Sequence, residues 1–141
     1  MERLSLPAVL ESLGELRRYV KDAADGAGVD AAKSYQLQLA VDEIATNAII
    51  YGYNNNGASG VISIGGEVRD GALVIILEDH APAFDPRSIP MPSAEDLARP
   101  LEERAIGGLG IFLTTQGVDR FDYRREGDRN LNIFEVRSGH D

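Results

Sequence analysis

The chain contains no cysteine, and only two of its 141 residues are histidine. The absence of cysteine excludes disulfides, thiol catalysis and thiolate metal sites. His80 and His140 are too few and too far apart in the sequence to form a zinc cluster. Any chemistry that the protein performs must therefore come from other residue types.

Basic residues are scarce, with 14 Lys and Arg against 23 Asp and Glu and a formal net charge of −9. Nucleic-acid phosphates are bound by clustered Lys and Arg, and none is evident, so we expect no direct nucleic-acid partner. The same charge disfavours an anionic membrane surface. No apolar run is long enough to cross a bilayer, and the first seven residues do not resemble a signal peptide. We therefore expect a cytoplasmic protein with no membrane partner.

The length and a hydrophobic content of 43% are typical of one globular domain, which we expect to span residues 1–141. A short edge strand is expected over residues 3–6. Pro7 then suits the first turn of a helix that ends near Gly26 or Gly28. A second helix is expected from an N-cap at Asp30 to about Tyr51. The first helix would carry an apolar stripe formed by Val9 or Leu10, Leu13, Leu16 and Val20.

Four further strands are expected in the rest of the chain. Asp70 and Gly71 predict a hairpin between residues 60–69 and 72–78, and the second of these runs is apolar enough for a central strand. Closing strands are expected over residues 119–125 and 130–137. The sequence therefore predicts an α+β fold, with helices on one face of a mixed, mostly antiparallel sheet.

Glu43 and Asn47 lie four residues apart in the second predicted helix, and therefore on the same face of it. The helix is otherwise mostly apolar, which implies burial on several sides, and a buried Glu is rare without a partner. One arrangement that would account for both residues is a pocket in which Asn47 holds a metal ion and Glu43 faces a reacting hydroxyl or water. Taken alone, such a pair is more often a solvated or hydrogen-bonded helix face.

Asp79 stands at the exit of the predicted central strand. Its carboxylate there could accept a hydrogen bond from an exocyclic amine such as that of adenine, and the small residues Ala81 and Ala83 leave room for a flat ring. The alternative is that Asp79 is simply a turn residue, because Asp is common in turns.

Three glycines, Gly107, Gly108 and Gly110, lead into a short helix expected within residues 109–116. Backbone amides at a helix N-terminus bind phosphate when no side chain covers them. The alternative is a flexible loop with a glycine start. The glycines have neither the spacing of a P-loop nor the context of a Rossmann fingerprint.

In their order along the chain, these features resemble the nucleotide-binding fold of the GHKL superfamily, which includes gyrase and histidine kinases. The chain is most similar to the small stand-alone members, the anti-sigma-factor serine kinases of bacterial partner-switching systems. The resemblance spans nearly the whole chain and implies a two-layer α/β sandwich of the Bergerat type. The motifs that carry it are residues 42–49, 51–53, 84–86, 107–111 and 127–131.

The resemblance implies ATP and Mg²⁺ as cofactors. Asn47 would be the Mg²⁺ ligand, and Glu43 would be the base that orients or deprotonates the attacking hydroxyl. Residues 87–106 would form a lid over the triphosphate, and Arg104 would neutralise charge on the transferred phosphoryl group. The implied nucleotide-binding residues are Asn47, Asp79, Ala81, Ala83, Phe84, Gly107, Gly108, Leu109 and Gly110.

Three residues depart from the family pattern. Ala81 stands where the family usually has Gly, and Ala83 stands where it usually has Gly or Pro. Tyr51 stands where it usually has His. Alanine adds a methyl group and disfavours positive φ, which could weaken ATP binding or shift the adenine. No departure affects the implied metal ligand or base.

The resemblance implies an ATP-dependent protein-serine kinase and anti-sigma factor, which phosphorylates an anti-sigma-antagonist protein and binds a sigma factor. Such kinases are usually dimeric, and an exposed apolar stripe on the first helix would serve a homodimer. The alternative is a non-catalytic switch that binds nucleotide or only a partner protein. The catalytic half of a histidine kinase is disfavoured, because no helical hairpin with a phosphoacceptor His is evident.

Overall fold

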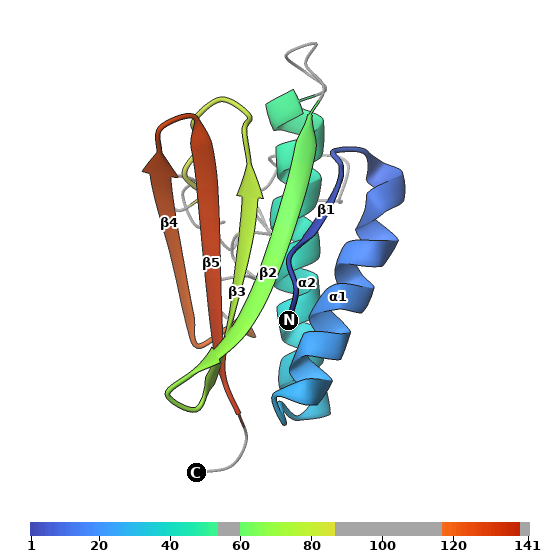
Figure 1. Cartoon of the computed structure of the whole chain (residues 1–141), viewed down its shortest axis with the longest axis vertical. Coiled ribbons are helices and arrows are strands. Elements are labelled where there is room, and N and C mark those ends of the chain that lie inside the picture. The colour runs from blue at the N-terminus through green and yellow to red at the C-terminus, as the bar shows by residue number, and fades with distance from the viewer. Residues whose placement is uncertain (54–59, 87–116, 139–141) are drawn as a thin grey trace, which may run out of the picture.

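The computed structural model describes residues 1–53, 60–86 and 117–138, which form a sheet covered on one face by two helices (Figure 1). The sheet has the strand order β1-β2-β3-β5-β4, and each of these pairings is antiparallel. The helices are α1 (Leu13–Gly26) and α2 (Ala31–Asn47). The predicted two-layer α+β fold is confirmed. The sequence predicts a mixed, mostly antiparallel sheet, and all pairings among the described strands are antiparallel. The strands are β1 (Leu4–Pro7), β2 (Val61–Arg69), β3 (Ala72–Asp79), β4 (Arg120–Glu126) and β5 (Arg129–Arg137).

Turn residues fix the register of the central hairpin. Asp70 and Gly71 both adopt positive φ, at 50° and 78°, as a two-residue hairpin turn of type I′ requires. The turn places Arg69 opposite Ala72 and makes β3 the central strand, with β2 and β5 on either side. All but one of residues 72–77 are buried, which confirms the predicted central strand.

Helix α2 begins at the expected cap and ends close to the expected position. The Asp30 side chain accepts a hydrogen bond from the backbone N–H of Lys33 at 2.9 Å, which satisfies one free amide of the first turn. Beyond Asn47 the chain continues as a wider π-helical turn, η2 (Ala48–Tyr53). Such turns are rare and are frequently found at functional sites.

The start of α1 differs from the prediction. Pro7 does not open the helix but ends β1, opposite Val61. An edge strand tolerates proline because its outward N–H position needs no partner. A 3-10 turn (Leu10–Ser12) then precedes α1. Val9 and Leu10 are consequently exposed and take no part in the apolar face of the helix.

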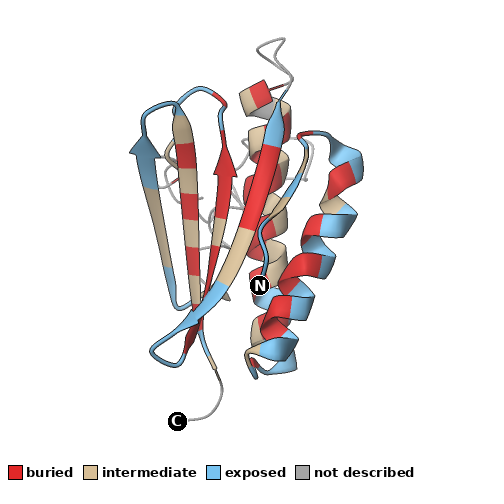
Figure 2. Cartoon of the chain, in the orientation of Figure 1, coloured by how far each residue is buried: buried red, intermediate tan, exposed pale blue. Residues whose placement is uncertain are grey.

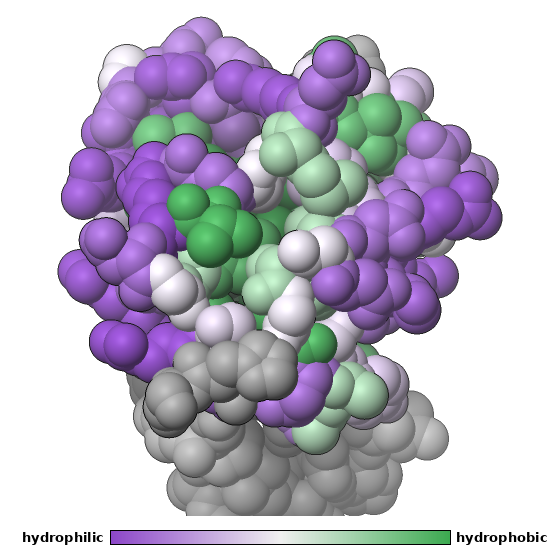
Figure 3. Space-filling view, turned by 60° about the horizontal axis from the view of Figure 1, so that its bottom comes forward, coloured by the Kyte–Doolittle hydropathy of each residue, from purple (hydrophilic) through white to green (hydrophobic). Residues whose placement is uncertain are grey.

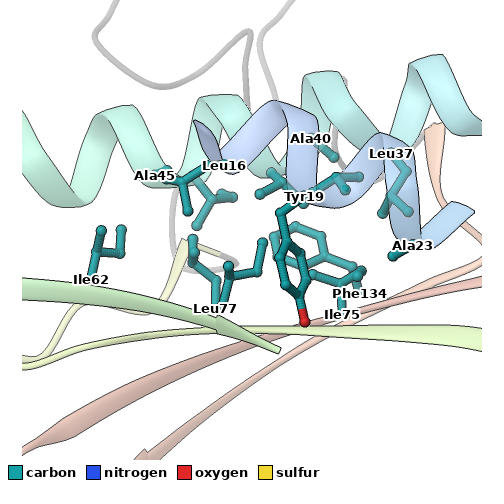
Figure 4. Packing of buried hydrophobic residues seen from close by; sticks show 14 of the residues in the cluster. Leu16, Tyr19, Ala23, Leu37, Ala40, Ala45, Ile62, Ile75, Leu77 and Phe134 are labelled. Carbon is teal, nitrogen blue, oxygen red and sulfur yellow. The ribbon is translucent and has the colours of Figure 1, made fainter. Parts of the chain in front are cut away.

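The apolar stripe of α1 packs inside the protomer. Figure 2 shows α1 with one buried and one exposed side, and Figure 4 shows Tyr19 reaching from α1 toward the sheet, with Leu16 among the buried residues. The expectation that this stripe is exposed and serves a homodimer is therefore wrong. Its buried residues are Leu16, Tyr19, Val20, Ala23 and Ala24.

Hydrophilic residues flank the hydrophobic middle of the molecule at one end of the sandwich (Figure 3). In the end view of Figure 3, hydrophobic residues lie between two hydrophilic flanks, as expected for a sandwich with its core between the layers. None of the helices described within residues 1–53, 60–86 and 117–138 combines the length and the apolar character needed to cross a membrane.

Candidate functional site

A cavity of about 200 Å³ lies between the end of α2 and the sheet, where β3 ends and β5 begins. It brings together five residues that the sequence singled out, from two separate segments of the chain: Asn47, Asp79, Ala81, Ala83 and Phe84. The other lining residues were not predicted as site residues: Ile44, Ala48, Gly52, Pro82, Pro86, Asn130 and Asn132.

Asp79 is the most deeply buried acidic group of the cavity, with 2% of its surface exposed. Its Oδ1 atom accepts two hydrogen bonds, from Asn130 Nδ2 at 2.8 Å and from the backbone N–H of Ala81 at 3.0 Å. Burial raises the pKa of the Asp79 carboxyl, and these two hydrogen bonds oppose that rise. No described residue hydrogen-bonds the second oxygen, Oδ2, which leaves it available to a ligand.

Asn130 is held in place by a network from β4. Its Oδ1 accepts hydrogen bonds from the Tyr123 hydroxyl and from Arg125 Nη1. Its Nδ2 donates to Asp79 and to the backbone oxygen of Ala81, the latter at 3.0 Å. Arg125 Nη1 donates to the same Ala81 oxygen at 2.9 Å. These bonds use the donors and acceptors of Asn130, so it positions Asp79 and the wall of the cavity.

Two other amides in the cavity lack partners. Asn47 is 8% exposed and Asn132 is 3% exposed. Asn47 Nδ2 and Asn132 Oδ1 are both buried without a hydrogen-bond partner. Leaving such a group unpaired costs about 1–3 kcal/mol, and folded proteins largely avoid it. Two unpaired amides in one cavity favour a site that binds a polar ligand.

Glu43 lies one helical turn before Asn47 but does not line the cavity. Its side chain is half-buried on α2. Burial raises the pKa of the Glu43 carboxyl, and the neighbouring charge of Asp42 raises it further. Asp42 itself accepts a hydrogen bond from Arg17 Nη1 at 2.9 Å. A carboxyl group with a raised pKa is suited to proton transfer near neutral pH.

The alanine at position 81 fits against a glycine. Among the described residues, Asp70 is the one non-glycine residue with positive φ, so the backbone at Ala81 is free of the strain that the family pattern suggested. The Ala81 methyl group is buried beside Gly52, where an added Cβ would lie 2.7 Å from the Ala81 Cβ. Gly52 therefore leaves the space that the Ala81 side chain fills.

We expect Gly52→Ala to destabilise the protein by about 1–3 kcal/mol, because two backbone segments would have to move apart. Adding Ala81→Gly should restore most of this stability, since it removes the opposing methyl group. Urea unfolding of the two single variants and the double variant measures the coupling. Gly26→Ala is the matched control, because a Cβ there meets nothing within 4 Å. Strictly additive effects at positions 52 and 81 would show that the contact is not tight.

Several predicted site residues lie outside the described residues. They are Arg104, Gly107, Gly108, Leu109 and Gly110, together with the predicted lid over residues 87–106 and the short helix within residues 109–116. In the part of the chain that the structure describes, no group of three or more His, Cys, Asp or Glu side chains could hold a metal ion.

Comparisons with known proteins agree with this arrangement. The family model of the histidine kinase-like ATPase domain matches residues 6–134. A serine-protein kinase RsbW from Oceanobacillus iheyensis is 31% identical over 117 residues, covering 82% of this chain and 73% of the relative. A serine-protein kinase RsbW from Staphylococcus epidermidis is 25% identical over 137 residues, covering 94% of this chain and 84% of the relative.

Solved structures share the fold at low sequence identity. The RsbU and RsbW domains of a Mycobacterium tuberculosis protein match with a TM-score of 0.61 at 13% identity. That match covers 97% of this chain and 32% of the other, so this chain spans about a third of that protein. The Acinetobacter baumannii histidine kinase AdeS matches with a TM-score of 0.53 at 14% identity, covering 99% of this chain and 70% of the other.

Proposed function

Because the chain belongs to the histidine kinase-like ATPase family, we propose that it binds ATP in the cavity and acts as a protein-serine kinase of a partner-switching system. One observation carries the proposal: Asp79 has one carboxylate oxygen fixed by Asn130 and Ala81 and the other free in a buried cavity. A free, oriented acceptor of this kind suits the exocyclic amine of adenine. The small side chains of Ala81 and Ala83 would leave space for the flat ring.

The cavity also fits the phosphate end of the nucleotide. Asn47 lines the cavity with its Nδ2 unpaired, and the amide oxygen of the same side chain is a type of ligand that Mg²⁺ accepts together with phosphate oxygens and water. Bound Mg²⁺ would supply charge neutralisation to the phosphates. Gly107, Gly108, Leu109 and Gly110 would offer backbone amides to the phosphates. Residues 87–106 would be the lid, with Arg104 beside the transferred group.

Glu43 would act on the hydroxyl of the protein substrate. Phosphoryl transfer depends mainly on position and charge neutralisation, so one carboxylate that orients or deprotonates a serine hydroxyl is enough. The raised pKa of Glu43 brings its titration nearer to neutral pH. It lies half-buried on α2, one turn before Asn47, and the hydroxyl of the protein substrate would have to approach it there.

The substrate in this proposal is an anti-sigma-antagonist protein, and the chain holds a sigma factor when that antagonist is phosphorylated. Residues 1–141 would act as one domain in the cytoplasm. A homodimer would have to use a surface other than the stripe of α1, which is buried.

The test is a phosphotransfer assay with purified components. Incubation of the chain with Mg·ATP and an antagonist should produce phosphoserine on the antagonist, detected by mass spectrometry, and calorimetry should show ATP binding. Absence of ATP binding at millimolar concentration would contradict the proposal and favour a switch that binds only proteins. ATP binding without transfer would favour a non-catalytic nucleotide switch.

A further inference from the structure

Asn130 and Asn132 alternate along β5 and therefore face the same side of the sheet. Asn130 lies opposite Asp79 in the register of β3 and β5, and Asn132 lies opposite Leu77. Both line the cavity, but only Asn130 has its hydrogen bonds made within the described part of the protein. Asn132 thus places a second polar group in the cavity, one pleat further along the sheet from Asp79.

Without a ligand, the unpaired buried amide oxygen of Asn132 lowers the stability of the folded protein. The next residues on the same face of β5 are Phe134 and Val136, both fully buried in the core. An apolar side chain at position 132 would continue that pattern and leave no buried polar atom unpaired. A bound molecule that hydrogen-bonds Asn132 offsets this penalty, and such a molecule must reach the part of the cavity beside Asp79.

We propose that Asn132 is a base-reading residue that hydrogen-bonds a ring nitrogen of a 6-aminopurine whose amine is held by Asp79. This inference rests on the proposed function. The amine of adenine stands between two ring nitrogens, N1 and N7, and both are acceptors. The unpaired atom of Asn132 is the acceptor Oδ1, and a half-turn of the amide puts the donor Nδ2 in its place, so the reversed amide can donate to either nitrogen. Asp79 and Asn132 together recognise the amine donor of adenine and the ring-nitrogen acceptor next to it.

In this proposal the pair selects against bases that lack the amine. Guanine and hypoxanthine carry a carbonyl oxygen in place of the amine, and that oxygen would face the acceptor Oδ2 of Asp79. Uracil and thymine likewise carry a carbonyl oxygen at that place, whereas cytosine has an amine beside a ring-nitrogen acceptor, as adenine does. Both residues are satisfied by a base with an amine next to a ring-nitrogen acceptor, and in the proposed function that base is the 6-aminopurine of ATP.

The inference is tested by a double-mutant cycle in which the Asn132 side chain and the ring nitrogen of the ligand are removed separately and together. Calorimetry compares ATP, 1-deaza-ATP and 7-deaza-ATP for the wild-type chain and for Asn132→Leu. We expect one deaza analogue to bind the wild-type chain about tenfold more weakly than ATP, the effect of one lost hydrogen bond in a buried site. We expect Asn132→Leu to bind ATP and that analogue equally, because the partner of the ring nitrogen is gone.

Controls separate recognition from folding. Without nucleotide, Asn132→Leu should raise the melting temperature by roughly 4–8 °C, since it removes an unpaired buried amide. Asn132→Ala repeats the cycle with a smaller side chain in case leucine disturbs the packing. Ser63→Ala is the matched control: Ser63 is 7% exposed on β2, bonds to Ser5 and does not line the cavity, so it should keep the wild-type ratios.

The outcomes are distinct. If the wild-type chain binds ATP but Asn132→Leu and Asn132→Ala discriminate against the analogues as the wild type does, the role of Asn132 is overturned and the proposed function stands. Equal binding of all three nucleotides by the wild-type chain likewise overturns the role of Asn132 and leaves the proposed function in place. If the wild-type chain binds none of them, the proposed function itself is overturned, and this inference with it.

Discussion

Asp79→Asn should reverse the preference of the protein between ATP and inosine triphosphate. In the wild-type chain, Asp79 Oδ1 is fixed by two donors, Asn130 Nδ2 and the backbone N–H of Ala81. In the variant, the same donors should hold the oxygen of the new amide in that place. The NH₂ group then stands where Oδ2 was, and a donor replaces the acceptor that meets the adenine amine.

We expect the variant to lose about 100-fold in ATP affinity, because a hydrogen bond to a charged group is lost and two donors are brought together. Inosine triphosphate carries a carbonyl oxygen in place of the amine, so its affinity should rise. The fold should survive, since burial already raises the pKa of the Asp79 carboxyl and a neutral amide relieves that burial.

Calorimetry with both nucleotides and a melting curve measure these effects. Asp22→Asn is the matched control, because Asp22 is exposed on α1 and does not line the cavity, so both affinities should stay unchanged. A variant at position 79 that still prefers ATP over inosine triphosphate would show that Asp79 does not hold the base.

Glu43→Gln should abolish phosphotransfer while leaving nucleotide binding intact. A positioned general base contributes about 10²–10⁴-fold, and glutamine keeps the shape but cannot take a proton. Glu43 does not line the cavity, so ATP affinity should stay within about threefold of the wild-type value. Quench-flow measurement of phosphoserine formation, together with calorimetry, separates the two effects. Full-rate transfer by this variant would remove Glu43 from the mechanism.

The pH dependence gives an independent check on Glu43. Burial raises the pKa of its carboxyl, and the base acts in its deprotonated form. The rate of transfer should therefore rise as the pH increases through this raised pKa and then level off. The charge of Asp42 contributes to that rise in pKa, so Asp42→Asn should keep transfer and move the increase in rate to lower pH. A shift to higher pH would contradict the assignment.

Local sequence signals predict most of the fold. Asp70 and Gly71 set a hairpin because the turn needs positive φ, and Asp30 caps α2 through its own side chain. Pro7 is the exception, because proline suits both the first turn of a helix and the end of an edge strand. The choice between these depends on the pairing of β1 with β2, across 50 or more residues of chain.

The site is only partly predictable for a similar reason. The spacing of Glu43 and Asn47 and the position of Asp79 can be read from single segments of the sequence. The contact of Gly52 with Ala81 forms only when the end of α2 packs against the exit of β3. The role of Asn132 depends on its lying across the cavity from α2. The visible sign in the sequence is a pair of asparagines alternating on an otherwise apolar strand face.

The central claim is that the cavity between α2 and the sheet binds the base and the metal end of ATP. The most direct measurement is an NMR titration of the side-chain amides of ¹⁵N-labelled protein with Mg²⁺ and a non-hydrolysable ATP analogue. We predict that the NH₂ resonances of Asn47 and Asn132, whose amides each have a buried atom without a partner, shift on addition of the analogue, and that the corresponding guanine nucleotide leaves them in place. Saturation of the protein with the ATP analogue while both of these resonances stay unmoved would contradict the claim.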